Sequence, residues 1–124
     1  MDSEITKKNI RNLVVSFYTK VLADETVGSF FIEKLGTELT SEAWAEHIDI
    51  LTNFWAGIYL GDTEYRGAPF VPHMQLEGLK RTTFEQWLKL FFKTLDSIYI
   101  PEIADQFKSR ATLIAGNFMR NLGL

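Results

Sequence analysis

The residues that could do metal or nucleophilic chemistry are few, because the chain has two histidines and no cysteine. Without cysteine, disulfides, a thiol nucleophile, thiolate zinc sites and iron–sulfur clusters are excluded. His47 lies on an apolar stripe at helical spacing, where, taken alone, a core or half-buried histidine with one hydrogen bond explains it better than a ligand role does. His73 follows Pro69 and Pro72, which restrict the backbone just before it. A metal ligand needs such a fixed ring orientation, although a surface-loop histidine is the alternative.

The spacing around the two histidines separates the possible metal sites. An H-E-x-x-H zinc site needs glutamate directly after the first histidine, but Ile48 follows His47. A di-iron carboxylate site needs glutamate three positions before each histidine, where this chain has Trp44 and Phe70. Haem iron needs only one strong protein ligand, because the porphyrin supplies the in-plane nitrogens. One imidazole in a helical pocket rich in aromatic rings therefore fits haem best.

Two polar aromatic residues are further candidates for contact with a ligand. Tyr18 lies at the edge of the apolar arc of the first expected helix, and Trp87 lies on the apolar face of a later one. Buried tyrosine O–H and tryptophan N–H groups need hydrogen-bond partners, and a diatomic ligand of ferrous haem carries partial negative charge. Taken singly, each ring is explained at least as well by simple core packing.

The pattern of apolar residues predicts an all-α fold with four long helices and short additional ones. The first long helix is expected to follow Thr6 and to reach about Leu22, and the second to follow Thr40 or Ser41 and to reach Leu60. The third is expected to start at a Thr82-x-x-Glu85 capping box and to reach Ile98, and the fourth to start at Pro101 and to reach Leu122. A short apolar turn around Phe30–Ile32 is expected to end at Gly36. The stretch Gly61–Gly78 is the longest break in the pattern, and loops of this length are usually functional or mobile.

Composition bounds the class of protein. With 124 residues, the chain is expected to form one domain, and its 10 Phe, 4 Tyr and 3 Trp supply many rings to a small core. The net charge of -3 argues against nucleic-acid binding. No apolar run approaches the length needed to cross a bilayer, and no secretory signal is visible at the N-terminus. We therefore expect a soluble cytoplasmic protein, which we take to be a monomer, with no membrane partner.

An ordered set of short motifs, no one of them decisive, extends from the first expected helix to the last. It comprises Phe17-Tyr18, Trp44-Ala45-Glu46-His47, Phe54-Trp55-Ala56-Gly57, Tyr65-Arg66-Gly67-Ala68-Pro69-Phe70, Pro72-His73 and Phe84-x-x-Trp87-Leu88-x-Leu90-Phe91. In this order and spacing, the set resembles the truncated haemoglobins of the third group. The chain contains no Gly-Gly pair, which agrees with the third group rather than the first two.

This resemblance implies a single truncated globin domain over residues 1–124, folded as a two-over-two helical sandwich with short accessory helices. It implies non-covalent haem b, with its iron held on the proximal side by His73. Tyr18, His47 and Trp87 would then be the polar residues of the distal, ligand-binding side. Residues expected to pack against the haem are Phe31, Leu51, Phe54, Met74, Leu76 and Phe91. Arg66, Lys80 and Arg81 lie where they could meet the haem propionates, or they are ordinary surface charges.

The function expected from this resemblance is reversible binding of O2, and of other small ligands such as NO, CO and cyanide, with tight hydrogen-bonded contact on the distal side. One alternative is a haem enzyme for NO detoxification or peroxidase-type chemistry, which would need an external reductase because the chain carries no flavin or nicotinamide motif. Another is a helical interaction module without haem, in which exposed aromatic rings would form the interface.

Overall fold

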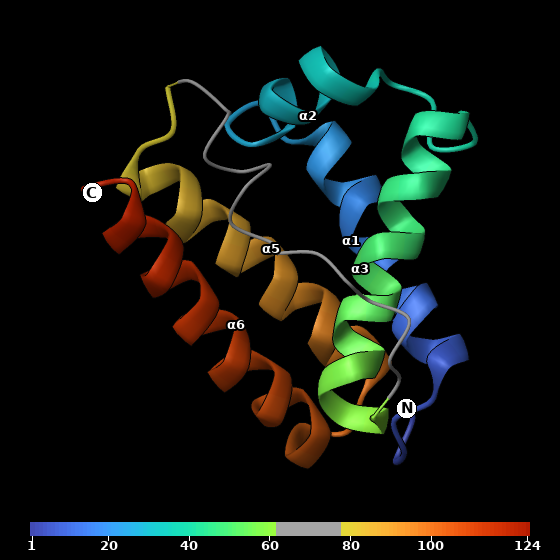
Figure 1. The fold of residues 1–124 in the computed structure, drawn as a ribbon. Helices are drawn as coiled ribbons and strands as arrows, with labels where there is room; N and C mark the ends of the chain where they lie inside the picture. The colour runs from blue at the N-terminus through green and yellow to red at the C-terminus, as the bar shows by residue number, and fades with distance from the viewer. Residues whose placement is uncertain (62–77) are drawn as a thin grey trace.

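The computed structural model describes residues 1–61 and 78–124, and all regular structure in those residues is helical (Figure 1). The helices are α1 (Lys7–Ala23), α2 (Gly28–Leu35), α3 (Glu42–Leu60), α5 (Arg81–Ile98) and α6 (Pro101–Asn121). The predicted all-α class and the four long helices are therefore confirmed. The predicted break at Gly61–Gly78 lies, apart from its two end residues, outside the described part of the chain.

Local hydrogen bonding explains where α1 and α3 begin and end. The Thr6 hydroxyl accepts from the Asn9 N–H at 3.1 Å, as its predicted N-cap role requires. Ser41, one of two residues expected to cap α3, accepts from the Trp44 N–H at 3.3 Å. Gly61 ends α3 with a φ of 71°, a left-handed conformation that favours glycine.

The start of α5 differs from the prediction. The helix begins at Arg81, with Lys80 as its N-cap, so the expected Thr82-x-x-Glu85 capping box is wrong. The Thr83 hydroxyl instead accepts from the Lys80 N–H at 3.2 Å, which places the helix start ahead of Thr82. The N-terminus of α6 agrees with the prediction, because Pro101 occupies its first turn.

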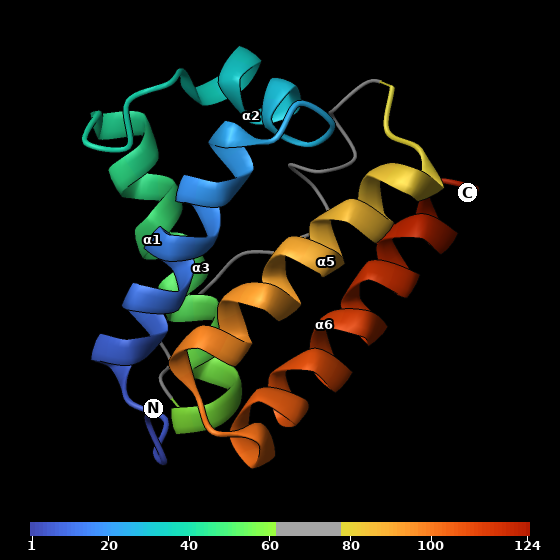
Figure 2. The ribbon, with the colours of Figure 1, turned by 180° about the vertical axis from the view of Figure 1, so that it is seen from behind.

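The long helices form two crossed pairs (Figures 1 and 2). One pair is α1 with α3, and the other is α5 with α6, which run antiparallel because only Tyr99 and Ile100 separate them. Helix α1 also packs against α5, which joins the two pairs into a two-over-two sandwich. Helix α2 lies against one end of α1, where a Cβ at Gly28 would collide with the Val21 carbonyl oxygen. Glycine at this position therefore lets α2 approach α1.

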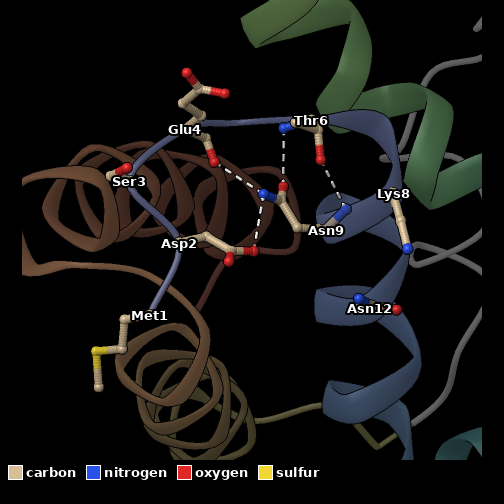
Figure 3. A pocket seen from close by; sticks show the side chains of 8 residues that line it. All are labelled: Met1, Asp2, Ser3, Glu4, Thr6, Lys8, Asn9 and Asn12. Atoms are coloured by element: carbon tan, nitrogen blue, oxygen red, sulfur yellow. Dashed lines mark hydrogen bonds between the residues drawn. The ribbon is translucent and has the colours of Figure 1, made fainter.

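The N-terminal residues are tied to the turn between α5 and α6 by a polar cluster centred on Asn9 (Figure 3). The Asp2 N–H donates to the Ile98 carbonyl at 2.8 Å, and the Ile100 N–H donates to the Asp2 carbonyl at 3.0 Å. The Asn9 side chain donates to Asp2 Oδ2 at 3.1 Å and to the Glu4 carbonyl at 2.8 Å. Among the residues that the structure describes, those lining the surface pocket beside this cluster include none of the predicted site residues.

None of the helices described here is long and apolar enough to cross a membrane.

Candidate functional site

Tyr18 and His47, predicted from sequence to share one site, lie in contact although they come from different helices. The Tyr18 ring on α1 and the His47 ring on α3 have centroids 4.9 Å apart. Two further rings complete this distal cluster: Trp44, with its centroid 5.2 Å from that of Tyr18, and Phe31 of α2, at 5.3 Å. Three helices therefore bring two polar aromatic side chains together within an otherwise apolar group of rings.

The Tyr18 hydroxyl is the group in the cluster that best indicates a ligand-binding role. The side chain is 1 % exposed, and its hydroxyl has no hydrogen-bond partner among the described residues. Burial raises the pKa of this hydroxyl above its usual value, so it remains a neutral donor at physiological pH. A buried donor without a partner costs about 1–3 kcal/mol. A ligand that accepts a hydrogen bond would remove that cost, so this donor fits the distal side of a haem pocket.

Thr52, one turn of α3 beyond Ile48, is the other residue whose buried hydroxyl has no hydrogen-bond partner within residues 1–61 and 78–124. It was not predicted as a site residue. Unlike Tyr18, Thr52 has no place in the distal cluster of rings, and it lines a polar groove between α1 and α3 with Arg11 and Asp49. Of these two hydroxyls, the one that lies in the distal cluster is therefore that of Tyr18.

Trp44 was predicted only as a core residue, but its position helps to fix the cluster. Its Nε1–H donates to the Gly36 carbonyl oxygen at 2.8 Å, which satisfies the indole and holds its orientation. The indole ring contacts both Tyr18 and His47, with centroid distances of 5.2 Å and 5.5 Å. The sequence does indicate the contact between Trp44 and His47, because Trp44 precedes His47 by nearly one helical turn and the two side chains therefore lie on the same face of the helix.

Trp87, the third predicted distal residue, is linked to the cluster through an intermediate ring. The centroid of Phe17 lies 4.9 Å from that of Tyr18 and 5.6 Å from that of Trp87. Trp87 and Phe31 also line one small, mainly apolar pocket of about 30 Å³ between α2, α5 and α6. The structure therefore places Trp87 near the predicted site, with the ring of Phe17 between it and Tyr18.

The residues predicted to pack against haem fall into two kinds within the described chain. Phe31 is buried in the distal cluster, and Leu51 and Phe54 on α3 are partly buried against the core. Phe91 is also buried, but its ring contacts are with core residues, namely Phe17, Trp55 and Trp87. Contact of these side chains with haem stays a prediction.

The predicted proximal side lies outside the described residues. This applies to His73, the predicted iron ligand, and to Arg66, Met74 and Leu76. Lys80 and Arg81, suggested as propionate partners, are described and exposed. Within residues 1–61 and 78–124, no group of three or more histidine, cysteine, aspartate or glutamate side chains is arranged to hold a metal ion.

Comparisons with known proteins agree with the fold. No protein-family model matches the chain. The chain is 37% identical over 118 residues to the Group 3 truncated hemoglobin ctb of Campylobacter jejuni, a match that covers 95% of this chain and 91% of that protein. The crystal structure of a group III truncated hemoglobin from Campylobacter jejuni superposes with a TM-score of 0.90 at 36% identity, covering 98% of this chain and 94% of the other.

Proposed function

Because this chain belongs to the group III truncated haemoglobins, a family of haem-binding globins, we propose that it holds haem b and reversibly binds O2 and other diatomic ligands. The observation that carries the proposal is the Tyr18 hydroxyl, a buried donor without a partner among the described residues. His47 lies against the same ring. A ligand of this site would find a polar contact inside an apolar, ring-lined environment.

The proposed division of roles assigns His73 to the proximal iron position and Tyr18, His47 and Trp87 to the distal side. Haem supplies a ferrous iron that binds small diatomic gases reversibly. Tyr18 donates its hydroxyl proton to the ligand as a hydrogen bond, and it stays protonated because burial raises its pKa. The surrounding Phe31 and Trp44 rings exclude water, which strengthens that hydrogen bond. Such an arrangement favours slow ligand release over rapid exchange.

The test of this proposal is haem capture by the purified protein. We expect the protein to take up added hemin and to give distinct optical spectra in its oxidised, reduced and CO-treated forms. Protein that stays colourless after incubation with hemin would overturn the proposal and favour the alternative of a helical interaction module without haem.

The two histidines offer a matched pair of variants for the same assay. We expect His73→Ala to lose haem retention, because it removes the proposed proximal ligand. We expect His47→Ala to retain haem with altered ligand kinetics, since His47 is placed on the distal side. Full retention of haem by His73→Ala, with loss in His47→Ala, would reverse the two assignments.

A second candidate function is a haem enzyme for NO detoxification or peroxidase-type oxidation, supplied with electrons by a separate reductase. The observation that favours peroxidase-type chemistry is a continuous stack of four aromatic rings that begins at Trp87 and contains three oxidisable residues, Trp87, Trp55 and Tyr59. Turnover of peroxide or NO with an added electron donor separates this function from simple ligand binding.

A further inference from the structure

Four aromatic rings form a continuous parallel stack that crosses from α5 to α3. Trp87 and Phe91 have centroids 5.5 Å apart and ring planes 8° from parallel. Phe91 and Trp55 follow at 5.5 Å and 19°. Trp55 and Tyr59 complete the stack at 6.1 Å and 8°. We call these four residues the ring stack.

The sequence builds the ring stack from two helical pairs. Trp87 and Phe91 are four residues apart on α5, and Trp55 and Tyr59 are four residues apart on α3, so each pair lies on one helix face. Phe91 and Trp55 are buried, at 2 % and 3 % exposure, whereas Trp87 and Tyr59 are only partly buried. The ring stack therefore has a dry middle and two ends that reach toward solvent.

The composition of the ring stack is chemically selective. Tryptophan and tyrosine are the aromatic side chains that lose a single electron most readily, and three of the four rings are of these types. Most other ring pairs in this part of the core are tilted or edge-on, such as Phe17 with Trp87 at 88° and with Phe91 at 81°. Parallel faces overlap their π-systems more than edge-on faces do, which favours passage of an electron from ring to ring.

The proton of the phenol decides which tyrosine can be oxidised, since a tyrosine that loses an electron must also release its hydroxyl proton. The buried Tyr18 hydroxyl has no acceptor among the described residues. The Tyr99 hydroxyl is buried against the Asn9 amide oxygen at 2.7 Å, which is not a base. The Tyr59 hydroxyl donates to the Gln106 carbonyl at 3.1 Å in an exposed setting, where water can take the proton. Of these three tyrosines, Tyr59 is the one suited to oxidation.

We propose that the ring stack carries oxidising equivalents from Trp87 to Tyr59, where an external phenolic hydrogen donor restores the tyrosine. Trp87 gives up one electron and is reduced again by an electron from Trp55. Trp55 is in turn reduced by an electron from Tyr59, and Tyr59 releases its hydroxyl proton to water. The donor then returns one hydrogen atom to the Tyr59 oxygen. Over two such cycles, one hydrogen peroxide and two donors give two waters and two donor radicals. The link from peroxide to Trp87 rests on the proposed haem function; the conduction from Trp87 to Tyr59 does not.

Conduction along the ring stack is testable without haem. Because the chain has no cysteine, a single cysteine replacing the exposed Glu85 on α5 carries a ruthenium photosensitiser at one defined place, two residues before Trp87. A flash in the presence of an irreversible electron acceptor oxidises the ruthenium centre. Transient absorption then distinguishes tryptophanyl from tyrosyl radicals by their different bands. We expect a tryptophanyl signal that decays into a tyrosyl signal.

Matched variants identify the path. Tyr59→Phe keeps the ring but removes the O–H, and we expect it to abolish the tyrosyl signal. Trp55→Phe keeps an aromatic ring in the middle of the stack, and we expect it to lose most of the tyrosyl yield. Tyr99→Phe, which removes a tyrosine outside the ring stack, is expected to leave the yield unchanged. A tyrosyl signal that survives in Tyr59→Phe overturns the proposal, and this variant, at a partly buried position, decides the matter even if Trp55→Phe does not fold.

The link to peroxide is tested separately in the haem-loaded protein. After addition of hydrogen peroxide, a spin trap and mass spectrometry locate the radical, which we expect on Tyr59 in the parent and not in Tyr59→Phe. A Tyr59 radical in the flash experiment without an adduct here would limit the proposal to conduction and overturn the role of Trp87 as its starting point. A protein that takes up haem normally but gives no tyrosyl signal in either experiment would overturn the ring stack alone, leaving the proposed gas binding intact.

Discussion

Tyr18 and Tyr99 are buried to the same degree, at 1 % exposure each, but they differ in hydrogen bonding. The Tyr99 hydroxyl donates to Asn9 Oδ1 at 2.7 Å, whereas the Tyr18 hydroxyl has no partner among the described residues. Burial raises the pKa of both hydroxyls, and the charge of Asp2 adds to the effect at Tyr99. The difference is therefore one of available partners, and it separates a structural tyrosine from one that is free to serve a ligand.

The surroundings of the two tyrosines explain the contrast. Around Tyr99, Asn9 satisfies the polar groups of the N-terminal residues: its Oδ1 also accepts from the Thr6 N–H at 2.9 Å, and its amide donates to Asp2 and Glu4. These hydrogen bonds use both the oxygen and the amide nitrogen of the buried Asn9 side chain, and a satisfied network of this kind rigidifies the fold. In the distal cluster the Tyr18 hydroxyl instead has no partner among the described residues, which is the arrangement expected of a binding site rather than of a core.

The largest effect is expected from Asn9→Ala, which removes the centre of the satisfied network. Four hydrogen bonds of the Asn9 side chain would be lost, and we expect the free energy of unfolding to fall by about 2–4 kcal/mol. Urea denaturation followed by circular dichroism measures the change. Asn12→Ala, at an exposed position on the same helix, is the control. An equal, small loss in both variants would contradict a structural role for the network.

Tyr18→Phe is expected to change ligand release rather than folding. A hydrogen bond to a charged acceptor contributes about 1.5–3 kcal/mol, so O2 dissociation should accelerate roughly ten- to a hundredfold. Stopped-flow displacement of O2 by CO in the haem-loaded protein measures the rate. Tyr99→Phe serves as the control and should release O2 at the parental rate. An unchanged rate in Tyr18→Phe would remove Tyr18 from the distal role.

Tyr99→Phe is expected to lower the free energy of unfolding more than Tyr18→Phe does, the reverse of their expected effects on O2 release. Tyr99→Phe removes a donor from Asn9 Oδ1, and we expect a loss of about 1 kcal/mol. Tyr18→Phe removes a hydroxyl that makes no protein hydrogen bond in the described chain, so its unfolding free energy should stay unchanged or rise. Thermal unfolding of both variants without haem measures this. Equal destabilisation would mean that the two hydroxyls are not different in kind.

The sequence predicted the helices well because their signals are local. Thr6, Ser41 and Pro101 mark helix starts by chemistry that acts within one turn. The predicted capping box at Thr82 was wrong because the helix begins earlier, with Lys80 as its N-cap, and Thr83 in the first turn accepts from the Lys80 N–H. Apolar periodicity does not fix the first residue of a helix to within one or two positions.

The site was less predictable from the residues alone, because its contacts cross between helices. Spacing placed Tyr18 and His47 on apolar faces, but it could not reveal that their rings meet or that the Tyr18 hydroxyl lacks a partner. Phe17, which links Tyr18 to Trp87, looked like an ordinary core residue for the same reason. Their relation depends on the packing of α1 against α3 and α5. The prediction that Tyr18, His47 and Trp87 share one site came from the resemblance to a family and not from the periodicity of apolar residues.

The smallest predicted effect concerns Asp24. Its side chain connects the turn before α2 to α5, and α2 is the helix that carries Phe31. Its carboxylate accepts from the Thr26 and Val27 N–H groups at 2.9 Å and 3.0 Å, and from Gln86 Nε2 at 2.7 Å. Burial pushes the pKa of this carboxyl upward, but these hydrogen bonds outweigh burial, so the net pKa lies below its usual value.

A carboxyl with a lowered pKa stabilises the fold above the pKa of the unfolded chain, about 3.9, and that contribution disappears as the pH falls through the lower folded value. We therefore expect Asp24→Asn to be less stable than the parent at neutral pH and to approach it under acid conditions. Gln86→Ala should show a weaker pH dependence than the parent, since one of the hydrogen bonds to the charged form is gone. Urea denaturation across the acid range measures all three proteins. A parent-to-variant difference that does not change with pH would show that the charge of Asp24 contributes nothing to holding α2 against α5.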